Sequence, residues 1–399
     1  MSQTQSHPAL LPTGLADVLP PDAEAASAAG ERAMALLRAN GYELVAPPML
    51  EFEDSFLSGA GEPLARETFR MMDPASRRML ALRSDLTPQI ARIAATRLAR
   101  AARPLRLCYL GSVMRVAGGR AGAERQFRQA GAELIGSRRP EADAEIVLLA
   151  AGALAAIGVA GVTVDLNVPR MAGEVAAAHG FDPARAPDLL AALDRKDAAE
   201  TRRLAPAAAD LLVALIEAGG PAEAALDAAD ALLLPPAAAE RVRRLRGIVA
   251  LIRAEAPDLA LTVDFVEHRG FDYHTGVAFS LFAEGHAGEL GRGGRYRSPR
   301  PEGAAVDPDD DPADARLGEP AIGFSIFMEA AGRAAARPAP PARVYLPHGA
   351  DAGGRAAVQA KGWVAVRGLA PAADPLAEAR RLGCGKLWRD GAILDIEEG

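Results

Sequence analysis

Residues 125–133 (RQFRQAGAE) follow a glycine-rich turn at residues 118–120 (GGR), and residues 109–115 (YLGSVMR) come before it. The extended, largely apolar character around this turn predicts strands at residues 105–110 and 126–135 that belong to one sheet. Two polar side chains on the second strand, Gln129 and Glu133, are of the type that accepts hydrogen bonds from a ligand. The search for a function therefore begins at this pair of strands.

Other elements follow outward from these strands. Strand-like patterns occur at residues 42–47, 78–83, 162–167, 261–266 and 277–282. Helical spacing of apolar residues predicts helices at about residues 20–40, 88–100 and 141–157. Residues 171–255 are rich in alanine and leucine and poor in β-branched residues, which indicates a helical insertion. We therefore expect an α+β fold.

These patterns divide the chain into several parts. The core is discontinuous, at residues 1–170 and 256–332, and the helical insertion at residues 171–255 interrupts it. Residues 297–319 include the run DPDDDP and are expected to form an acidic, proline-rich loop. An Ala/Pro linker at residues 333–341 leads to a small α/β domain at residues 342–399. In that domain the Asp-Gly pair at residues 390–391 predicts a hairpin turn.

Composition limits the classes of function. The 399 residues are 50% hydrophobic and 24% charged, with a formal net charge of −7. This charge gives no overall attraction to nucleic acid or to an anionic membrane. Cys108 and Cys384 offer neither a disulfide framework nor metal-ligand spacing. No apolar run approaches the roughly 20 residues that span a bilayer, and the first residues lack an apolar signal core. We expect a soluble, cytoplasmic protein with no metal and no cofactor.

Four separated segments resemble, in the same order, the histidyl-tRNA synthetase branch of the class II aminoacyl-tRNA synthetases. Residues 41–47 (GYELVAP) are similar to the dimer-forming motif, and residues 82–87 (LRSDLT) are similar to the histidine-pocket segment. The third segment combines residues 109–115 and 125–133; the fourth combines residues 269–276 (RGFDYHTG) and 293–296 (GGRY). The third and fourth are the most specific. The resemblance covers about residues 11–331 and implies a six-stranded antiparallel sheet flanked by helices.

The segments supply a candidate histidine-binding site. Its members are Asp85, Thr87, Arg115, Gln129, Glu133, Arg269, Tyr273 and His274. Oxygen atoms of the acidic and amide members can accept hydrogen bonds from an ammonium group, and Arg269 can hold a carboxylate through its planar fork. Tyr273 and His274 offer a flat wall and a hydrogen-bonding edge to an imidazole. Two positions depart from the family pattern, which has a glutamate at Asp85 and a second tyrosine at His274.

The nucleotide side of the resemblance is incomplete. The family has a glutamate that contacts adenine, an aspartate after the GGRY segment, and an arginine that clamps the phosphates of ATP. These positions hold Ala117, Arg297 and Ala330. Because loss of a phosphate-binding arginine costs roughly three to five decades of rate, we expect no efficient adenylate formation and assign no catalytic residue. The C-terminal domain has eight basic and seven acidic residues, without the basic excess of a tRNA-binding surface.

A synthetase-like core with these losses resembles the regulatory subunits of ATP phosphoribosyltransferase. The resemblance implies a non-catalytic homodimer within a hetero-oligomer that also contains the short-form catalytic subunit. Such a subunit is needed for catalytic activity and confers feedback inhibition by L-histidine in the first step of histidine biosynthesis. Two alternatives remain: a divergent histidyl-tRNA synthetase with weak aminoacylation, and a dimeric accessory factor that binds RNA. Pyrophosphate exchange would identify the former, and a salt-dependent RNA shift assay the latter.

Overall fold

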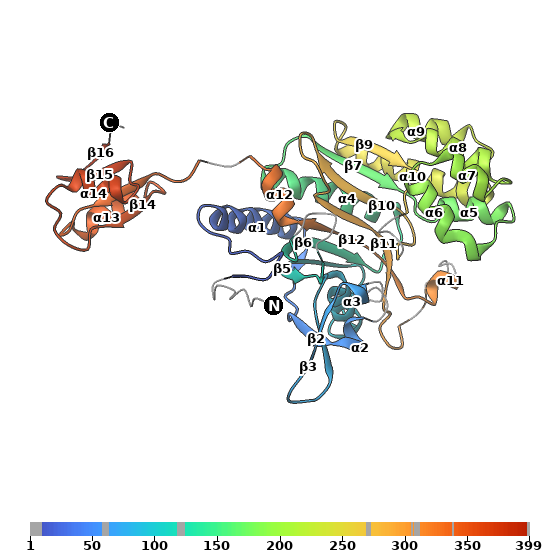
Figure 1. The fold of residues 1–399 in the computed structure, drawn as a ribbon, viewed down its shortest axis with the longest axis horizontal. Helices are drawn as coiled ribbons and strands as arrows, with labels where there is room; N and C mark the ends of the chain where they lie inside the picture. Colours follow the sequence, from blue (N-terminus) through green and yellow to red (C-terminus); the bar gives the residue numbers. More distant parts are fainter. Residues whose placement is uncertain are drawn as a thin grey trace, which may run out of the picture. The chain divides into compact units, whose positions relative to one another are not determined.

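The computed structural model describes residues 10–57, 64–117, 124–268, 273–304, 306, 312–336 and 339–396. The chain divides into two compact units, Met1–Ala336 and Arg337–Gly399. The first unit contains the large sheet and most of the helices (Figure 1). The two units are described separately.

The centre of the large sheet consists of six consecutive antiparallel strands. In spatial order they are β5 (Leu105–Met114), β6 (Gln126–Ile135), β12 (Glu319–Phe327), β11 (Gly291–Ser298), β10 (Ala278–Ala283) and β7 (Val162–Asn167). The antiparallel core expected from the sequence is thus confirmed, and the strands at residues 126–135 and 162–167 have the predicted bounds.

The complete sheet is larger than expected, with nine strands in a mixed arrangement. Three short edge strands extend it: β1 (Glu43–Leu44), β9 (Ala260–Asp264) and β8 (Gly220–Pro221). The first two pair in parallel with β5 and β7, and β8 pairs with β9 in antiparallel register. The strands β1 and β9 overlap those predicted at residues 42–47 and 261–266, whereas β8, with two residues, carries too little pattern to be read as a strand.

One face of the sheet is covered by α1 (Asp22–Ala39) and α4 (Pro140–Ile157), which pack on each other and on β5, β6, β7 and β12. The Arg128 side chain of β6 points to this face, because its Nη1 donates to the α1 carbonyl of Ala26 at 3.2 Å. Since successive strand residues face opposite sides, Gln129 and Glu133 lie on the other face. The helix α3 (Thr87–Thr96) contacts β6 and β11 there.

A second, three-stranded sheet adjoins α3. Its order is β2 (Leu50–Phe52), β4 (Met79–Leu82) and β3 (Phe69–Met72), with antiparallel pairing throughout. The short helix α2 (Glu53–Phe56) follows β2 and buries Phe56. The sequence pattern predicted only the strand that became β4.

Residues 171–255 connect the parallel strands β7 and β9, and a connection between parallel strands needs a long crossover. This crossover is helical and lies at the β9 edge of the sheet (Figure 1). Its helices are α5 (Met171–Ala178), α6 (Ala186–Asp194), α7 (Ala198–Leu204), α8 (Ala209–Glu217), α9 (Ala222–Asp230) and α10 (Pro236–Glu255), with the 3-10 turn η2 (Pro183–Arg185). It also contributes β8 to the large sheet.

The stretch at residues 297–319, expected to be a loop, contains one short helix in its described part. This helix is α11 (Pro312–Ala315), and Glu319 already begins β12. The helix α12 (Met328–Ala334) follows β12 directly and ends the first unit. In the described part of the chain, no helix is long and apolar enough to cross a membrane.

The second unit is a small α/β fold with a four-stranded sheet. The strand order is β14 (Val364–Arg367), β13 (Arg343–Leu346), β15 (Lys386–Arg389) and β16 (Ala392–Asp395). Two helices accompany it, α13 (Ala352–Gln359) and α14 (Pro375–Arg381). The predicted hairpin turn joins β15 to β16, with Asp390 and Gly391 both at positive φ.

Candidate functional site

Glu133 lies at the centre of a buried polar group on the face of the sheet opposite α1 and α4. Its side chain is fully buried in β6. Thr87 Oγ1 and the Tyr109 hydroxyl donate to its Oε1 at 3.0 and 3.2 Å, and the Tyr296 hydroxyl donates to Oε2 at 3.0 Å. The paired residue of β12 is Gly323, where a Cβ would lie 1.7 Å from Oε2. Glycine at this position therefore leaves the space that the carboxylate occupies.

Burial determines the protonation of this group. Burial raises the pKa of Glu133 to about 8, although hydrogen bonds from Tyr296 and Thr87 act in the opposite direction. Burial and then the neighbouring Glu133 charge also raise the pKa of Tyr109 and Tyr296, so both phenols remain donors. With a pKa near 8, Glu133 is mostly protonated at neutral pH in the unliganded chain. An N–H donor placed against it would favour the ionised form.

Gln129 and Asp85 extend the polar group along the sheet toward Arg115. Gln129 donates from Nε2 to Asp85 Oδ2 at 3.0 Å, and its Oε1 accepts the Leu86 backbone N–H at 3.1 Å. Asp85 Oδ1 accepts the Thr87 backbone N–H at 2.9 Å, and Arg115 Nη2 lies 3.7 Å from Asp85 Oδ2. A continuous series of contacts therefore joins five of the predicted site residues. They are Asp85, Thr87, Arg115, Gln129 and Glu133.

Two aromatic rings border this polar group. The ring centroids of Tyr273 and His274 are 4.1 Å apart, and Tyr273 meets Tyr296 edge-on at 6.4 Å. His274 is 2% exposed and lies over Gly294, where a Cβ would approach its Cδ2 to 2.3 Å. Tyr273 is 37% exposed. Its ring is therefore the part of the wall that a ligand could reach.

Seven of the eight predicted site residues lie in this one neighbourhood, and Arg269 lies outside the described residues. Sequence reasoning missed Tyr109 and Tyr296, whose hydroxyls reach Glu133. Both belong to segments that carried the family resemblance. Their role depends on strand register, which sets Tyr109 opposite Gly131 and Glu133 opposite Gly323.

Comparison with known proteins decides the family. The histidyl-tRNA synthetase family model matches residues 14–331. The chain is 49% identical to the ATP phosphoribosyltransferase regulatory subunit of Rhodospirillum centenum, over 98% of this chain and 97% of that one. This chain belongs to the family of ATP phosphoribosyltransferase regulatory subunits.

Two solved structures are similar in fold to this regulatory subunit. The first is an ATP phosphoribosyltransferase regulatory subunit/histidyl-tRNA synthetase from Bacillus halodurans C, with a TM-score of 0.76 and 22% identity over 95% of this chain and 97% of that one. The second is a chain of the ATP phosphoribosyl transferase (HisG:HisZ) complex from Thermotoga maritima. Its TM-score is 0.56, with 14% identity over 75% of this chain and 97% of that one. At these identities the likeness concerns the fold alone.

Beside Gln129, this face of the sheet carries a pair of packed aromatic rings. Phe127 and Phe327 are almost fully buried and meet edge to face at 5.9 Å between ring centroids. Ala330 is 2% exposed, so the methyl group that replaces the clamp arginine is part of the core. The carboxylate of Glu329 accepts the Arg128 backbone N–H at 2.9 and 3.1 Å. This carboxylate therefore connects the start of α12 to the backbone of β6.

The other two altered positions also hold side chains that differ from the family's nucleotide-contacting residues. Arg297, in place of the usual aspartate, lies 3.6 Å from Asp314 and donates to the Gly318 carbonyl at 3.4 Å. Ala117, in place of the adenine-binding glutamate, is exposed. The arrangement agrees with a non-catalytic member of the family.

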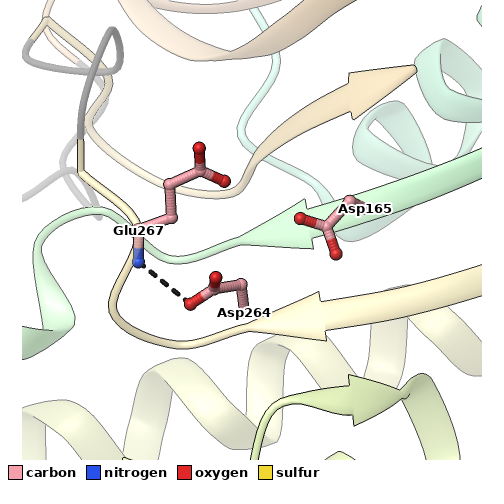
Figure 2. A group of neighbouring side chains, drawn as sticks. All are labelled: Asp165, Asp264 and Glu267. Carbon is pink, nitrogen blue, oxygen red and sulfur yellow. Dashed lines mark hydrogen bonds between the residues drawn. The ribbon is translucent and has the colours of Figure 1, made fainter. Parts of the chain in front are cut away.

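A second polar cluster lies where β7 and β9 end (Figure 2). Asp165, Asp264 and Glu267 each place one carboxylate oxygen within 4.8 Å of the others. Lys196 Nζ contacts Asp264 Oδ2, and the Thr262 hydroxyl donates to Asp165 Oδ1 at 2.5 Å. Lys196 and Thr262 thus already contact two of these carboxylates, and the cluster does not by itself define a metal centre.

Proposed function

We propose that this regulatory subunit binds L-histidine around Glu133 and thereby controls a short-form ATP phosphoribosyltransferase catalytic subunit. The observation that carries the proposal is the fully buried Glu133 carboxylate, which accepts hydrogen bonds from three neutral hydroxyls. An imidazole or ammonium N–H is the kind of donor that would stabilise its ionised form. Histidine carries both groups.

The surroundings of Glu133 suit the rest of a zwitterionic ligand. Asp85 and Gln129 offer further oxygen acceptors, and Arg115 lies close to them as a cation. The partly exposed ring of Tyr273 can stack against an imidazole. We retain Arg269 as a proposed ligand of the effector carboxylate, on sequence grounds alone. A single amino acid could engage all of these groups, because the series of contacts from Arg115 to Glu133 is short.

We also propose that the subunit forms a homodimer within the hetero-oligomer. The three-stranded sheet exposes a set of large apolar side chains, and such patches mark protein interfaces. They are Leu50, Phe52, Met71, Met72 and Met79. Leu44 of the edge strand β1 is also 51% exposed and lies in the segment that resembles the dimer-forming motif. We assign this surface to a second copy of the chain, and we expect the assembly to be cytoplasmic.

The effect of histidine would follow from differential affinity. A ligand shifts an equilibrium between two assembly states only by the difference in its affinity for them, on the order of 1–3 kcal/mol in allosteric systems. Histidine bound at Glu133 would favour the arrangement in which the catalytic subunit is inhibited. The regulatory subunit itself would carry out no chemical step.

The test measures phosphoribosyl transfer to ATP by the short-form catalytic subunit of the same organism, with and without this chain, across a histidine titration. We expect strong activation by the chain and suppression of that activation by histidine. ATP-dependent pyrophosphate exchange by the chain alone, measured in parallel, is expected to stay at background. No activation, or exchange well above background, would overturn the proposal, and the latter would indicate a divergent synthetase.

A further inference from the structure

Lys196 occupies a backbone conformation that normally selects glycine. It follows the C-terminus of α6, where its backbone N–H donates to the Leu193 carbonyl at 2.9 Å and that of Asp197 donates to the Ala192 carbonyl at 3.0 Å. This pair of bonds is the Schellman arrangement, in which the residue at the lysine position is usually a left-handed glycine. Lys196 has φ = 56°. A strained non-glycine residue of this kind points to a use for its side chain.

The Lys196 side chain reaches from the helical crossover to the end of a sheet strand. Its Nζ contacts Oδ2 of Asp264, the last residue of β9. Oδ1 of the same aspartate accepts the backbone N–H groups of Val266 and Glu267, both at 3.0 Å. Figure 2 shows the bond from Glu267 to Asp264. The ammonium group thus holds the carboxylate that forms the turn after β9.

A second contact from the same corner fixes the next residues of the chain. Asp194, the last residue of α6, accepts the His268 backbone N–H at Oδ1, at 2.8 Å. Residues 194–197, here named the α6–α7 corner, therefore hold the chain at residues 264–268. The two aromatic residues of the candidate histidine site, Tyr273 and His274, follow only a few residues later.

Electrostatics makes the lysine important for this turn. The carboxylates of Asp165, Asp264 and Glu267 lie within 4.8 Å of one another and repel when ionised. The adjacent Asp264 charge contributes, after burial, to a raised pKa of Asp165. The Lys196 ammonium offsets part of this repulsion. Without it, the turn would lose both a contact and a compensating charge.

We propose that the α6–α7 corner positions the aromatic wall of the histidine site, and so links the helical crossover to occupancy of that site. The inference rests on the proposed function, because it assumes that histidine binds near Tyr273. Lys196 and Asp194 are positioning residues, since they act through residues 264–268.

The experiment measures histidine affinity of the full-length chain by calorimetry, together with its melting temperature. Lys196→Gly relieves the left-handed strain and removes the ammonium group. Because the relief of strain and the loss of the Asp264 contact oppose each other, we expect the melting temperature to change little and the histidine affinity to be about five- to twentyfold lower. Lys196→Asn, which tolerates the same backbone conformation, should behave alike. Lys196→Arg keeps the charge and should recover most of the affinity.

Arg77→Gly is the matched control. Arg77 is a basic residue at φ = 58° in the turn between β3 and β4, and its replacement relieves the same strain and removes the same charge. We expect wild-type histidine affinity from this variant. Wild-type affinity in Lys196→Gly and Lys196→Asn, with the wild-type chain binding histidine, would overturn the positioning role alone. A wild-type chain that does not bind histidine would overturn the proposed site and this inference together.

Discussion

Two halves of one sheet face differ in chemistry. The half around Glu133 is polar, and the half next to it is apolar. Around Glu133, polar side chains are hydrogen-bonded to one another, and Gly323 leaves room for the carboxylate. Two residues before Gln129 on β6, Phe127 packs edge to face against Phe327 of β12 and forms the apolar half. Phe327 is the register partner of Gln129, so the apolar half begins directly beside the polar one.

With histidine bound at Glu133 as proposed, ligand recognition and chemistry would be separable on this scaffold. The polar half retains acceptors for a charged amino acid, each of which must be satisfied once it is buried. The apolar half packs Phe127 against Phe327, and a buried Ala330 stands at the position of the family's phosphate-binding arginine. A sensor needs only the former half, and four predictions test whether the two halves are as independent as this comparison implies.

The largest effect is expected from Glu133→Gln. The substitution keeps the side-chain volume beneath Gly323 but removes the charge that would receive an imidazole or ammonium N–H. Loss of a charged hydrogen-bonding partner costs about 2–3 kcal/mol, which corresponds to roughly 30- to 150-fold weaker histidine binding. Calorimetric titration of the full-length chain with histidine measures this change.

Glu145→Gln is a matched control for that variant. The Glu145 carboxylate also accepts a tyrosine hydroxyl, from Tyr42 at 2.8 Å, but it belongs to α4 on the other face of the sheet. We expect this variant to bind histidine as the wild type does. Equal losses in both variants would mean that the effect comes from general destabilisation, and the placement of the site at Glu133 would be wrong.

An intermediate effect is expected from pH. Because burial raises the pKa of Glu133 to about 8, the empty site holds a proton at pH 7 and releases it when an N–H donor favours the carboxylate. Linkage then predicts that histidine affinity rises about fivefold between pH 7 and 8 and levels off above that. Titration in two buffers of different ionisation enthalpy should show proton release at pH 7. A flat profile, or proton uptake, would contradict the role of Glu133.

The same pKa fixes the sign of a stability change in the unliganded chain. The folded-state pKa of about 8 lies above the ordinary value of 4.5, so the protonated carboxyl stabilises the fold fully below about pH 4.5. This contribution is lost as the pH rises toward 8. We expect the unliganded wild type to lose stability over this range relative to Glu133→Gln, and denaturant unfolding at several pH values measures the difference.

The sequence could reveal four of the six central strands and most members of the candidate site, because these patterns are local, but it gave no strand prediction for β11 or β12. Gln129 and Glu133 lie in one strand segment, and Asp85 and Thr87 lie in one short motif. The set of hydroxyl groups that donate to Glu133 could not be predicted, because it depends on which residues of β5, β6 and β12 stand opposite one another. The Lys196–Asp264 contact could not be predicted for a similar reason, because it joins residues 68 positions apart through tertiary packing.

The smallest effect is expected from Phe327→Leu, on the apolar half. Leucine keeps an apolar side chain beside Gln129 but removes the edge contact with Phe127, so the free energy of unfolding should fall by about 1–2 kcal/mol. Histidine affinity should stay within about twofold of the wild type, since no hydrogen bond of the polar group involves this ring. Denaturant unfolding and calorimetry on the same preparation measure both quantities. A tenfold loss of affinity would mean that the packed rings support the position of Gln129, so that the apolar half serves the effector site as its rigid wall.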